Sequence, residues 1–266
     1  MADIVVFPTR APVEAAPATP NIRMENGLYA AVMVVPVHNE EREISAFLQQ
    51  WRREIPEMPL ILVLDRCTDN SLAVAQKTAD ALLAPKTPGP APQAFLHLEV
   101  LRFNPFGKAG ACLSGLWRAL RLGLAGNTPV LFWDADNEYA LSRAFIESLV
   151  HWVLYNGGLA SGRRSGRKLW KSRLALAVTR LTLRGFTRKT PPADVLTGVH
   201  ALPLGHALFA MNGARTFDME TRLAYYALRH GLPLWEAEVG YFPRTEGKKI
   251  RAYHLWGILL AAAGFR

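Results

Sequence analysis

Carboxylates at alternate positions mark the segment Trp133-Asp134-Ala135-Asp136-Asn137-Glu138. This segment ends the apolar run 129–133, which has the character of a buried strand. Acidic side chains leaving one strand can converge on a hard divalent cation such as Mg²⁺ or Mn²⁺, which takes oxygen ligands and often keeps diphosphate oxygens in its shell. A solvated turn whose aspartates cap the next helix is the plainer alternative. In this context we favour metal binding.

Two further polar segments follow apolar runs. In Asp65-Arg66-Cys67-Thr68-Asp69-Asn70-Ser71, Asp65 leaves a strand and can accept hydrogen bonds from a base or from ribose hydroxyls, whereas Asp69 or Asn70 suits helix capping. Residues 36–41 lie where another strand turns into a helix and can line a nucleoside pocket. His38 in this segment lacks a histidine partner at metal-binding spacing.

The elements that would position these segments alternate along the chain. Apolar runs occupy residues 30–35, 60–64, 95–101 and 129–133, and helical spacing occupies residues 40–51, 71–83 and 109–124. This alternation predicts an α/β fold with a mostly parallel sheet covered by helices on both faces. Ligands bind such sheets at the carboxyl ends of strands, and residues 104–108 form a fourth polar segment there.

Composition fits one folded domain, because half of the 266 residues are hydrophobic and only 20% are charged. We expect a flexible Ala- and Pro-rich tail over residues 1–27, the main domain over 28–252 and an apolar C-terminal segment over 253–266. The two cysteines, without a CxxC pair, suit a reduced cytoplasmic protein. No secretory signal and no membrane-spanning run is expected.

The net charge of +9 favours an anionic partner, which can be a nucleic acid, anionic lipid headgroups or a phosphorylated substrate. A nucleic acid is disfavoured, because no nucleic-acid-binding motif accompanies the charge. Between residues 163 and 189 an apolar helical face is accompanied by basic side chains, which suits a membrane interface. An ordinary surface helix with its apolar stripe on the core is the alternative. With the apolar residues 253–265, this helix favours peripheral association with the inner face of a membrane. The apolar face contains Trp170, Leu174, Ala177, Val178 and Leu181.

Taken in order, these segments resemble the family-2 glycosyltransferases, and within them the dolichol-phosphate mannosyltransferase-like branch. The resemblance covers about residues 30 to 251 and implies a GT-A-type fold. It is carried by residues 35–41, 64–70, 107–109, 134–136, 161–163, 197–201, 217–220 and 244–250. Two departures are Leu64, where the family has an acid, and His200, where a Lys or Arg is usual.

The resemblance implies roles for individual residues. Asp134 and Asp136 match metal and diphosphate positions, and Glu138 falls where the branch often has a metal-facing Gln. Arg163 and Arg173 match arginines near the sugar and the acceptor phosphate. The nucleotide and donor set comprises Pro36, His38, Glu40, Asp65, Lys108, Ala135 and the basic-loop residues Arg244, Lys248 and Lys249.

The implied activity is inverting transfer of a hexose from a GDP- or UDP-linked donor to a polyprenyl phosphate. The alternative acceptor is a glycan, a glycolipid or a small hydroxyl compound, whose deprotonation Asp218 or Glu220 would assist. A sugar nucleotidyltransferase is disfavoured, because residues 36–41 are acidic and lack the glycine-rich basic loop of that class. A non-catalytic nucleotide-sugar binder is disfavoured by the aspartates and arginines together.

Overall fold

The computed structural model describes residues 31–84, 95–165, 170–215, 218–242 and 252–265. The expected tail 1–27 and the basic-loop residues Arg244, Lys248 and Lys249 lie outside the described residues. The strands are β1 (Val32–Val37), β2 (Leu60–Asp65), β3 (Leu96–Leu101), β4 (Pro129–Phe132), β5 (Leu159–Arg164), β6 (His200–Pro203) and β7 (Leu234–Val239). The helices are α1 (Ile44–Glu54), α2 (Ser71–Leu83), α3 (Gly107–Arg121), α4 (Arg143–Asn156), α5 (Trp170–Thr187), α6 (Leu204–Met211), α7 (Met219–His230) and α8 (Ala252–Ala262).

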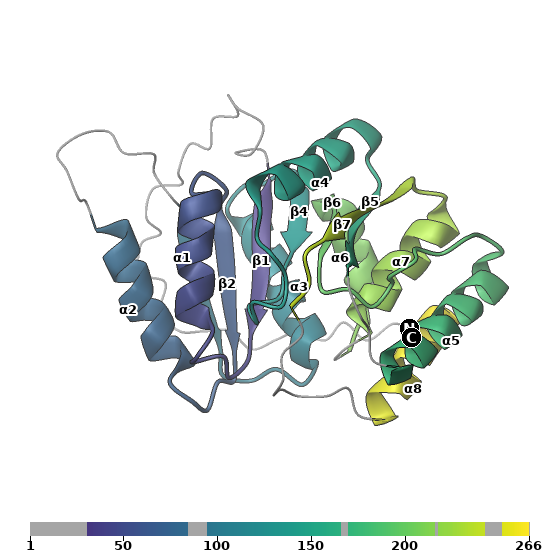
Figure 1. The fold of residues 1–266 in the computed structure, drawn as a ribbon, viewed down its shortest axis with the longest axis horizontal. Coiled ribbons are helices and arrows are strands. Elements are labelled where there is room, and N and C mark those ends of the chain that lie inside the picture. Colours follow the sequence, from purple (N-terminus) through teal and green to yellow (C-terminus); the bar gives the residue numbers. More distant parts are fainter. Residues whose placement is uncertain (1–30, 85–94, 166–169, 216–217, 243–251, 266) are drawn as a thin grey trace, which may run out of the picture.

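The seven strands form one sheet in the order β3-β2-β1-β4-β6-β5-β7 (Figure 1). β6 pairs antiparallel with both β4 and β5, while the other pairs are parallel, so the sheet is mostly parallel as expected. The carboxyl ends of β2, β1 and β4, three adjacent strands, therefore meet at one edge of the sheet. The polar segments singled out by sequence follow these three ends.

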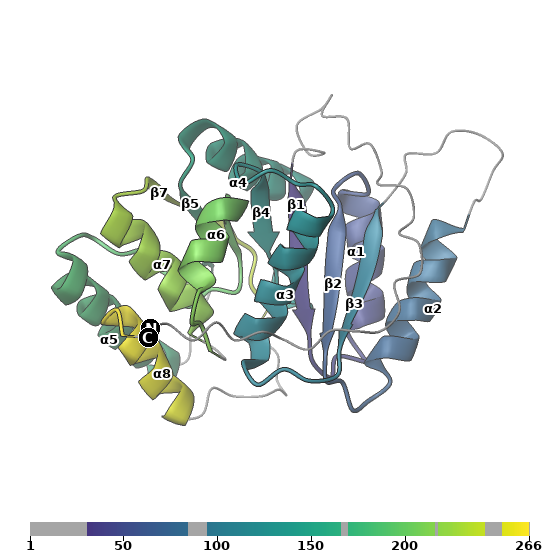
Figure 2. The same cartoon turned by 180° about the vertical axis from the view of Figure 1, so that it is seen from behind.

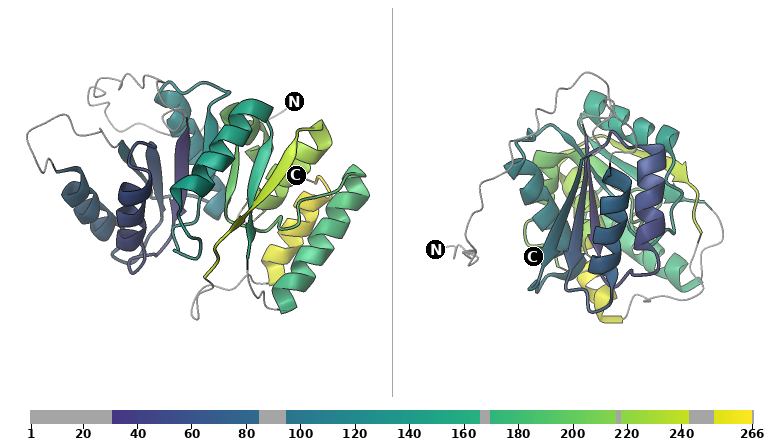
Figure 3. Two further views of the ribbon diagram at one scale, coloured as in Figure 1. Left: turned by 45° about the horizontal axis from the view of Figure 1, so that its top comes forward. Right: turned by 90° about the vertical axis from the view of Figure 1, so that its left-hand side faces the viewer.

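Helices cover both faces of the sheet, and the two hydrophobic clusters of the core lie on either side of it. Figure 1 shows α1, α2 and α4 in front of the sheet, and Figure 2 shows α3, α6 and α7 on the opposite face. Figure 3 gives the same layers from two further directions. Fully buried Phe47 and Trp51 anchor α1, each contributing about 1.5–3 kcal/mol through burial of apolar surface.

Gly115 allows α3 to pack closely on the sheet. A Cβ at this position would come within 2.4 Å of Val34 Cγ1 on β1, so only glycine permits the observed approach. The close packing fixes α3 against β1 and β2, and Lys108 in the first turn of this helix is thereby carried to the sheet edge where the polar segments lie.

The apolar stripe of α5 does not face the core. Leu174, Val178 and Leu181 are exposed, and the opposite side of the helix, including Thr179 and Leu183, is buried. The alternative, an ordinary surface helix with this stripe packed on the core, is therefore wrong. α5 contacts α8 and α7, which places the three helices side by side at one end of the molecule (Figures 1 and 2).

Candidate functional site

The loops after β1 and β2 are tied together by hydrogen bonds that involve side chains. Asn39 accepts from the Thr68 amide at 2.8 Å and donates to the Thr68 hydroxyl at 3.0 Å. The amide of Glu40 donates to Ser71 Oγ at 2.7 Å. Asn39 has a positive φ of 57°, which asparagine tolerates better than most residues. The two loops thus form one structure beyond the sheet edge.

Two of the expected nucleoside-binding residues meet in this structure. His38 Nδ1 lies 2.6 Å from the backbone carbonyl oxygen of Asp65, so that nitrogen carries the proton and donates. The buried Asp65 carboxylate accepts from Arg66 Nε at 3.1 Å and Nη2 at 3.4 Å. Pro36 is half-buried within β1, and Glu40 begins the turn that leads into α1.

Of the two candidates for capping the following helix, Asn70 is the N-cap residue of α2 and makes no side-chain capping hydrogen bond, whereas Asp69 precedes it. Asp69 Oδ1 accepts from the Ser71 amide at 3.0 Å and from the Ser71 hydroxyl at 2.6 Å. Partial burial would raise the pKa of Asp69, but these hydrogen bonds and one from the Glu41 amide outweigh it, so the pKa is lowered. Asp69 therefore serves α2 and the loop contact, whereas Asp65 remains at the strand end.

Lys108 joins the segment after β4 to α7. Its Nζ lies 2.7 Å from Asp134 Oδ1 and 2.7 Å from Glu220 Oε1. Burial alone would lower the pKa of Lys108, but the two carboxylates raise it well above the usual value, so the ammonium stays charged. Lys108 and Glu220 are separated by 112 positions in sequence. The expected donor-binding lysine therefore neutralises two carboxylates that enter from different elements.

Gly198 makes room for Asp134. A Cβ on Gly198 would lie 2.0 Å from Asp134 Oδ2, a distance that no side chain can occupy. The Gly198 amide donates to the Tyr139 hydroxyl at 2.8 Å, which holds this backbone against the loop that follows β4. Sequence reasoning assigned no role to Gly198, although it lies within one of the segments that carry the resemblance.

His200 is buried behind this contact and is uncharged. Nε2 lies 2.9 Å from the Thr197 carbonyl oxygen and therefore carries the proton, while Nδ1 accepts from the Ser161 hydroxyl at 2.9 Å. Burial, followed by the nearby Lys108 ammonium, lowers the pKa of His200 to about 4. The neutral His200 therefore places no second cation beside Lys108.

The remaining expected metal ligands lie in the same loop. Asp136 Oδ1 accepts from the Glu138 amide at 3.2 Å, and Glu138 Oε2 accepts from the Tyr241 hydroxyl at 2.9 Å. Asn137 has a φ of 57° and donates to the Glu43 carbonyl oxygen at 2.9 Å, which ties the loop to the start of α1. The loop is therefore held from both sides.

These carboxylates supply oxygen donors of the kind that Mg²⁺ and Mn²⁺ prefer, but not a complete ligand set. Within the described residues, no three His, Cys, Asp or Glu side chains are grouped so as to hold a metal ion. Lys108 already occupies one side of Asp134. The donor set thus fits a divalent cation only if a bound diphosphate completes its shell.

The arginines selected from sequence point away from this loop or lie on another element. Arg163 on β5 pairs with Glu238 on β7 at 2.6 Å, and both side chains are largely exposed. Arg173 is exposed on α5. Arg164 follows Arg163 on β5 but was not among the residues predicted from sequence. Its side chain points to the opposite side of the strand from that of Arg163, because successive strand residues face opposite ways.

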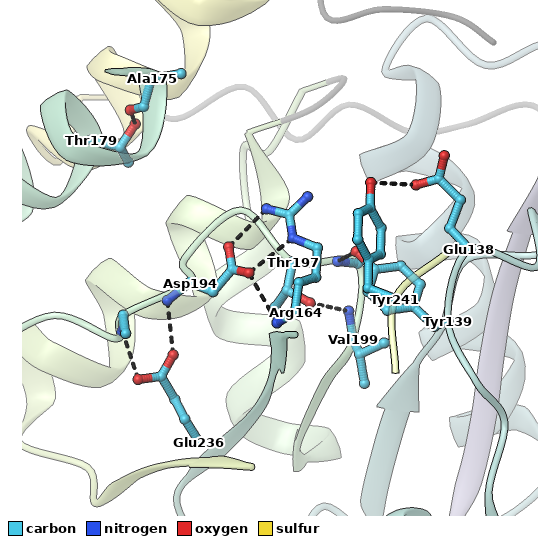
Figure 4. Close-up of polar contacts among 12 residues, drawn as sticks. Glu138, Tyr139, Arg164, Ala175, Thr179, Asp194, Thr197, Val199, Glu236 and Tyr241 are labelled. Atoms are coloured by element: carbon cyan, nitrogen blue, oxygen red, sulfur yellow. Dashed lines mark hydrogen bonds and ion pairs between the residues drawn. The ribbon is translucent and has the colours of Figure 1, made fainter. Parts of the chain in front are cut away.

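Arg164 forms a buried network with side chains around the loop (Figure 4). Its Nε and Nη2 donate to the two oxygens of Asp194 at 2.9 and 2.7 Å, and its guanidinium lies 5.4 Å from the ring centre of Tyr241. Glu236 accepts from the amides of Ala193 at 2.6 Å and Asp194 at 2.9 Å. No sequence motif marks these residues, because the contacts join three separate segments.

The two candidate general bases are both buried and paired. Asp218 accepts from the Arg215 amide at 2.6 Å and from Arg222 Nε at 2.8 Å. Burial raises the pKa of Asp218 more than Arg222 lowers it. Glu220, also buried, is engaged by Lys108. These two carboxylates at the start of α7 thus have ion-pair partners, Arg222 on α7 for Asp218 and Lys108 on α3 for Glu220.

No family model and no curated protein sequence matches the chain. Solved structures do match. One is glucosyl-3-phosphoglycerate synthase from Mycobacterium tuberculosis in complex with Mn²⁺, UDP and phosphoglyceric acid, with a TM-score of 0.59 and 18% identity over 89% of this chain and 79% of that chain. The same enzyme with Mn²⁺, UDP-glucose and phosphoglyceric acid gives a TM-score of 0.57 and 15% identity over 96% and 86%.

A third structure of that synthase, in complex with Mg²⁺ and UDP, has a TM-score of 0.58 and 18% identity over 89% of this chain and 80% of that chain. At such identities the likeness establishes the fold. The expected GT-A-type α/β fold is therefore confirmed. The likeness does not single out the dolichol-phosphate mannosyltransferase-like branch.

Proposed function

We propose that this chain is a metal-dependent glycosyltransferase that takes its sugar from a nucleoside-diphosphate donor, UDP-linked in preference to GDP-linked. The observation that carries this proposal is the convergence of His38, Asp65 and Asp134 at the carboxyl ends of three adjacent strands. The likeness to a synthase described with UDP-glucose and Mn²⁺ supports the same donor chemistry.

The side chains suggest different binding roles for the different loops. Asp65 and the loop that carries His38 would bind the nucleoside, and Asp134 and Asp136 would hold the diphosphate side. A divalent cation bound there would stabilise the negative charge that develops on the leaving diphosphate. Lys108 holds the Asp134 carboxylate in place, because its ammonium lies 2.7 Å from Asp134 Oδ1.

For the acceptor we propose a small hydroxyl compound that carries a phosphate. The synthase structures were described with phosphoglyceric acid and with glycerol 3-phosphate, which favours this alternative over the polyprenyl phosphate implied by the resemblance. Mass spectrometry of products formed from glycerol 3-phosphate and from a polyprenyl phosphate would distinguish the two acceptors. A product whose new linkage contains the acceptor phosphate would refute the hydroxyl acceptor.

A thermal-shift experiment tests the donor proposal. Ligands that bind only the folded state stabilise it by about 2.7 kcal/mol at a concentration of 100 Kd. We expect UDP with Mn²⁺ to raise the melting temperature, and Asp136→Ala to remove the Mn²⁺-dependent part of this rise. Asp80→Ala, at an exposed position of α2, is the matched control and should behave as the unmodified protein. No shift with any nucleotide sugar would refute the proposal.

A lipid-phosphate acceptor is the second candidate, and two observations favour it. An ionised phosphate needs no general base, which agrees with the ion-paired state of Asp218 and Glu220. The second observation is the exposed face of α5 and α8, which carries apolar side chains, has arginines beside them and has no acidic residue in either helix. The exposed apolar residues are Leu174, Val178, Leu181, Phe186, Trp256 and Leu260.

We propose that this face lies on an anionic membrane surface. Arginines and a Trp-containing apolar face suit the lipid interface, where cations meet acidic headgroups. Among the described helices, none is long and apolar enough to cross a bilayer. Co-sedimentation should show binding to vesicles rich in phosphatidylserine, little binding to neutral vesicles, and loss of binding in Leu174→Glu/Leu181→Glu.

Leu154→Glu, an exposed leucine on α4, is the matched control for this experiment. It should leave vesicle binding unchanged, because α4 covers the opposite face of the sheet. Equal sedimentation with neutral and anionic vesicles would contradict the charge argument. Concentration-dependent dimerisation that the double variant abolishes, without vesicle binding, would instead assign the face to a second copy of the chain.

A further inference from the structure

A series of contacts runs from β7, the outermost strand on one side of the sheet, to the loop after β4. Glu236 on β7 accepts two backbone amides, which fixes the segment that carries Asp194. Asp194 receives both nitrogens of the Arg164 fork and also the Arg164 backbone amide at 3.1 Å. The Asp194 side chain is fully buried, so its position is set by these partners.

The contacts continue from Arg164 through an aromatic ring to a carboxylate. The Arg164 guanidinium lies over the Tyr241 ring, which also packs against Tyr139 with 5.5 Å between ring centres. The Tyr241 hydroxyl donates to Glu138 Oε2 at 2.9 Å. An isolated antiparallel bridge joins Tyr139 to Tyr241 and sets the height of the ring relative to the loop.

We propose that Tyr241 and Arg164 are positioning residues that fix the orientation of Glu138 within the loop after β4, where the proposed function places the cation. This inference rests on the proposed function, because the orientation of Glu138 matters to catalysis only if a cation and a diphosphate bind beside it. Arg164 acts through the ring of Tyr241, and Tyr241 acts through its hydroxyl. Neither residue needs to touch the substrate or the reacting atoms for this role.

The physical reason is that a ligand's affinity for a metal depends on how well its orientation is fixed before binding. A glutamate has three rotatable bonds, and ordering a free side chain on binding costs free energy. Hydrogen-bond partners of metal ligands typically change metal affinity 10- to 100-fold when they are removed, an order-of-magnitude range taken from other metal sites. The bidentate Arg164–Asp194 pair provides the rigid base for this arrangement.

The test measures Mn²⁺ binding in the presence of saturating UDP, by the electron paramagnetic resonance signal of free Mn²⁺. Tyr241→Phe keeps the ring but removes the hydroxyl, and we expect it to raise the Mn²⁺ Kd about tenfold. Arg164→Lys should weaken binding in the same direction. Tyr226→Phe is the matched control, since that hydroxyl contacts His206 on a different face, and its Kd should equal that of the unmodified protein.

A double-mutant cycle isolates the pathway through Glu138. In a Glu138→Ala background, Tyr241→Phe should change the Mn²⁺ Kd less than twofold, because the group it positions is gone. The inference is overturned if Tyr241→Phe alone leaves the Kd within twofold of the unmodified protein, or if its effect persists in the Glu138→Ala background. Absence of UDP-dependent Mn²⁺ binding in the unmodified protein is a separate result, which would overturn the proposed function and this inference with it.

Discussion

Replacing Lys108 with methionine removes the cation shared by Asp134 and Glu220. Lys108 and Glu220 are nearly buried, with side-chain exposures of 16% and 8%, and Asp134 is 22% exposed. Methionine fills a similar volume without charge, so the variant tests electrostatics more than packing. Removal of one partner from a buried ion pair typically destabilises a protein by about 3–5 kcal/mol, because the remaining charge is left uncompensated. We expect a loss of this size.

The pH dependence of this loss has a defined sign. The pKa of Lys108 is raised above its usual 10.5, so in the unmodified protein its contribution is fully present below that pH and is lost only as pH rises through the higher folded value. In Lys108→Met this contribution is missing at every pH at which the lysine would be charged. We therefore expect the same deficit in the free energy of unfolding at about pH 7 and about pH 9, and a smaller one only above about pH 10.5.

Urea denaturation followed by tryptophan fluorescence gives the free energy of unfolding. Glu220→Gln in the Lys108→Met background should restore more than half of the loss, because it removes the second uncompensated charge. Lys77→Met, at an exposed position of α2, is the control and should lie within about 0.5 kcal/mol of the unmodified protein. A Lys108→Met protein that unfolds within about 1 kcal/mol of the unmodified one would refute the proposed role of the buried ammonium.

Three further outcomes follow from the site. Gly198→Ala must displace the Asp134 carboxylate, since the new Cβ would lie 2.0 Å from Oδ2, and turnover should fall about 10²-fold in a donor assay. The pKa of His200 is lowered from 6.5 to about 4, so the free energy of unfolding of the unmodified protein falls as the pH drops through this range. His200→Gln should abolish this part of the fall, which amounts to at most about 3 kcal/mol, as measured by urea denaturation at about pH 7 and about pH 4.5. Asp218→Asn should lower the free energy of unfolding in urea, because the Asp218 carboxylate is bound by Arg222. Its kcat should change only a few-fold, whereas loss of a general base lowers kcat by about 10²–10⁴-fold.

The sequence by itself determined the first half of the sheet and the place of the site. Buried strands such as β2 are apolar at nearly every position, which a parallel strand covered on both faces requires. Because the carboxyl ends of parallel neighbours meet at one edge, Asp65, His38 and Asp134 could be brought together from their positions alone. The glycosyltransferase interpretation of that edge rested further on the ordered set of motifs.

Only the tertiary structure decided the contacts between distant segments. Local pattern does not reveal that Lys108 reaches Glu220, or which of Arg163 and Arg164 faces the loop, because strand pairing and register are set by residues far apart in sequence. The exposed stripe of α5 is a further case, since periodicity identifies an apolar face but not what covers it. Elements follow from neighbours along the chain, whereas the charges and faces that act together follow from how those elements pack.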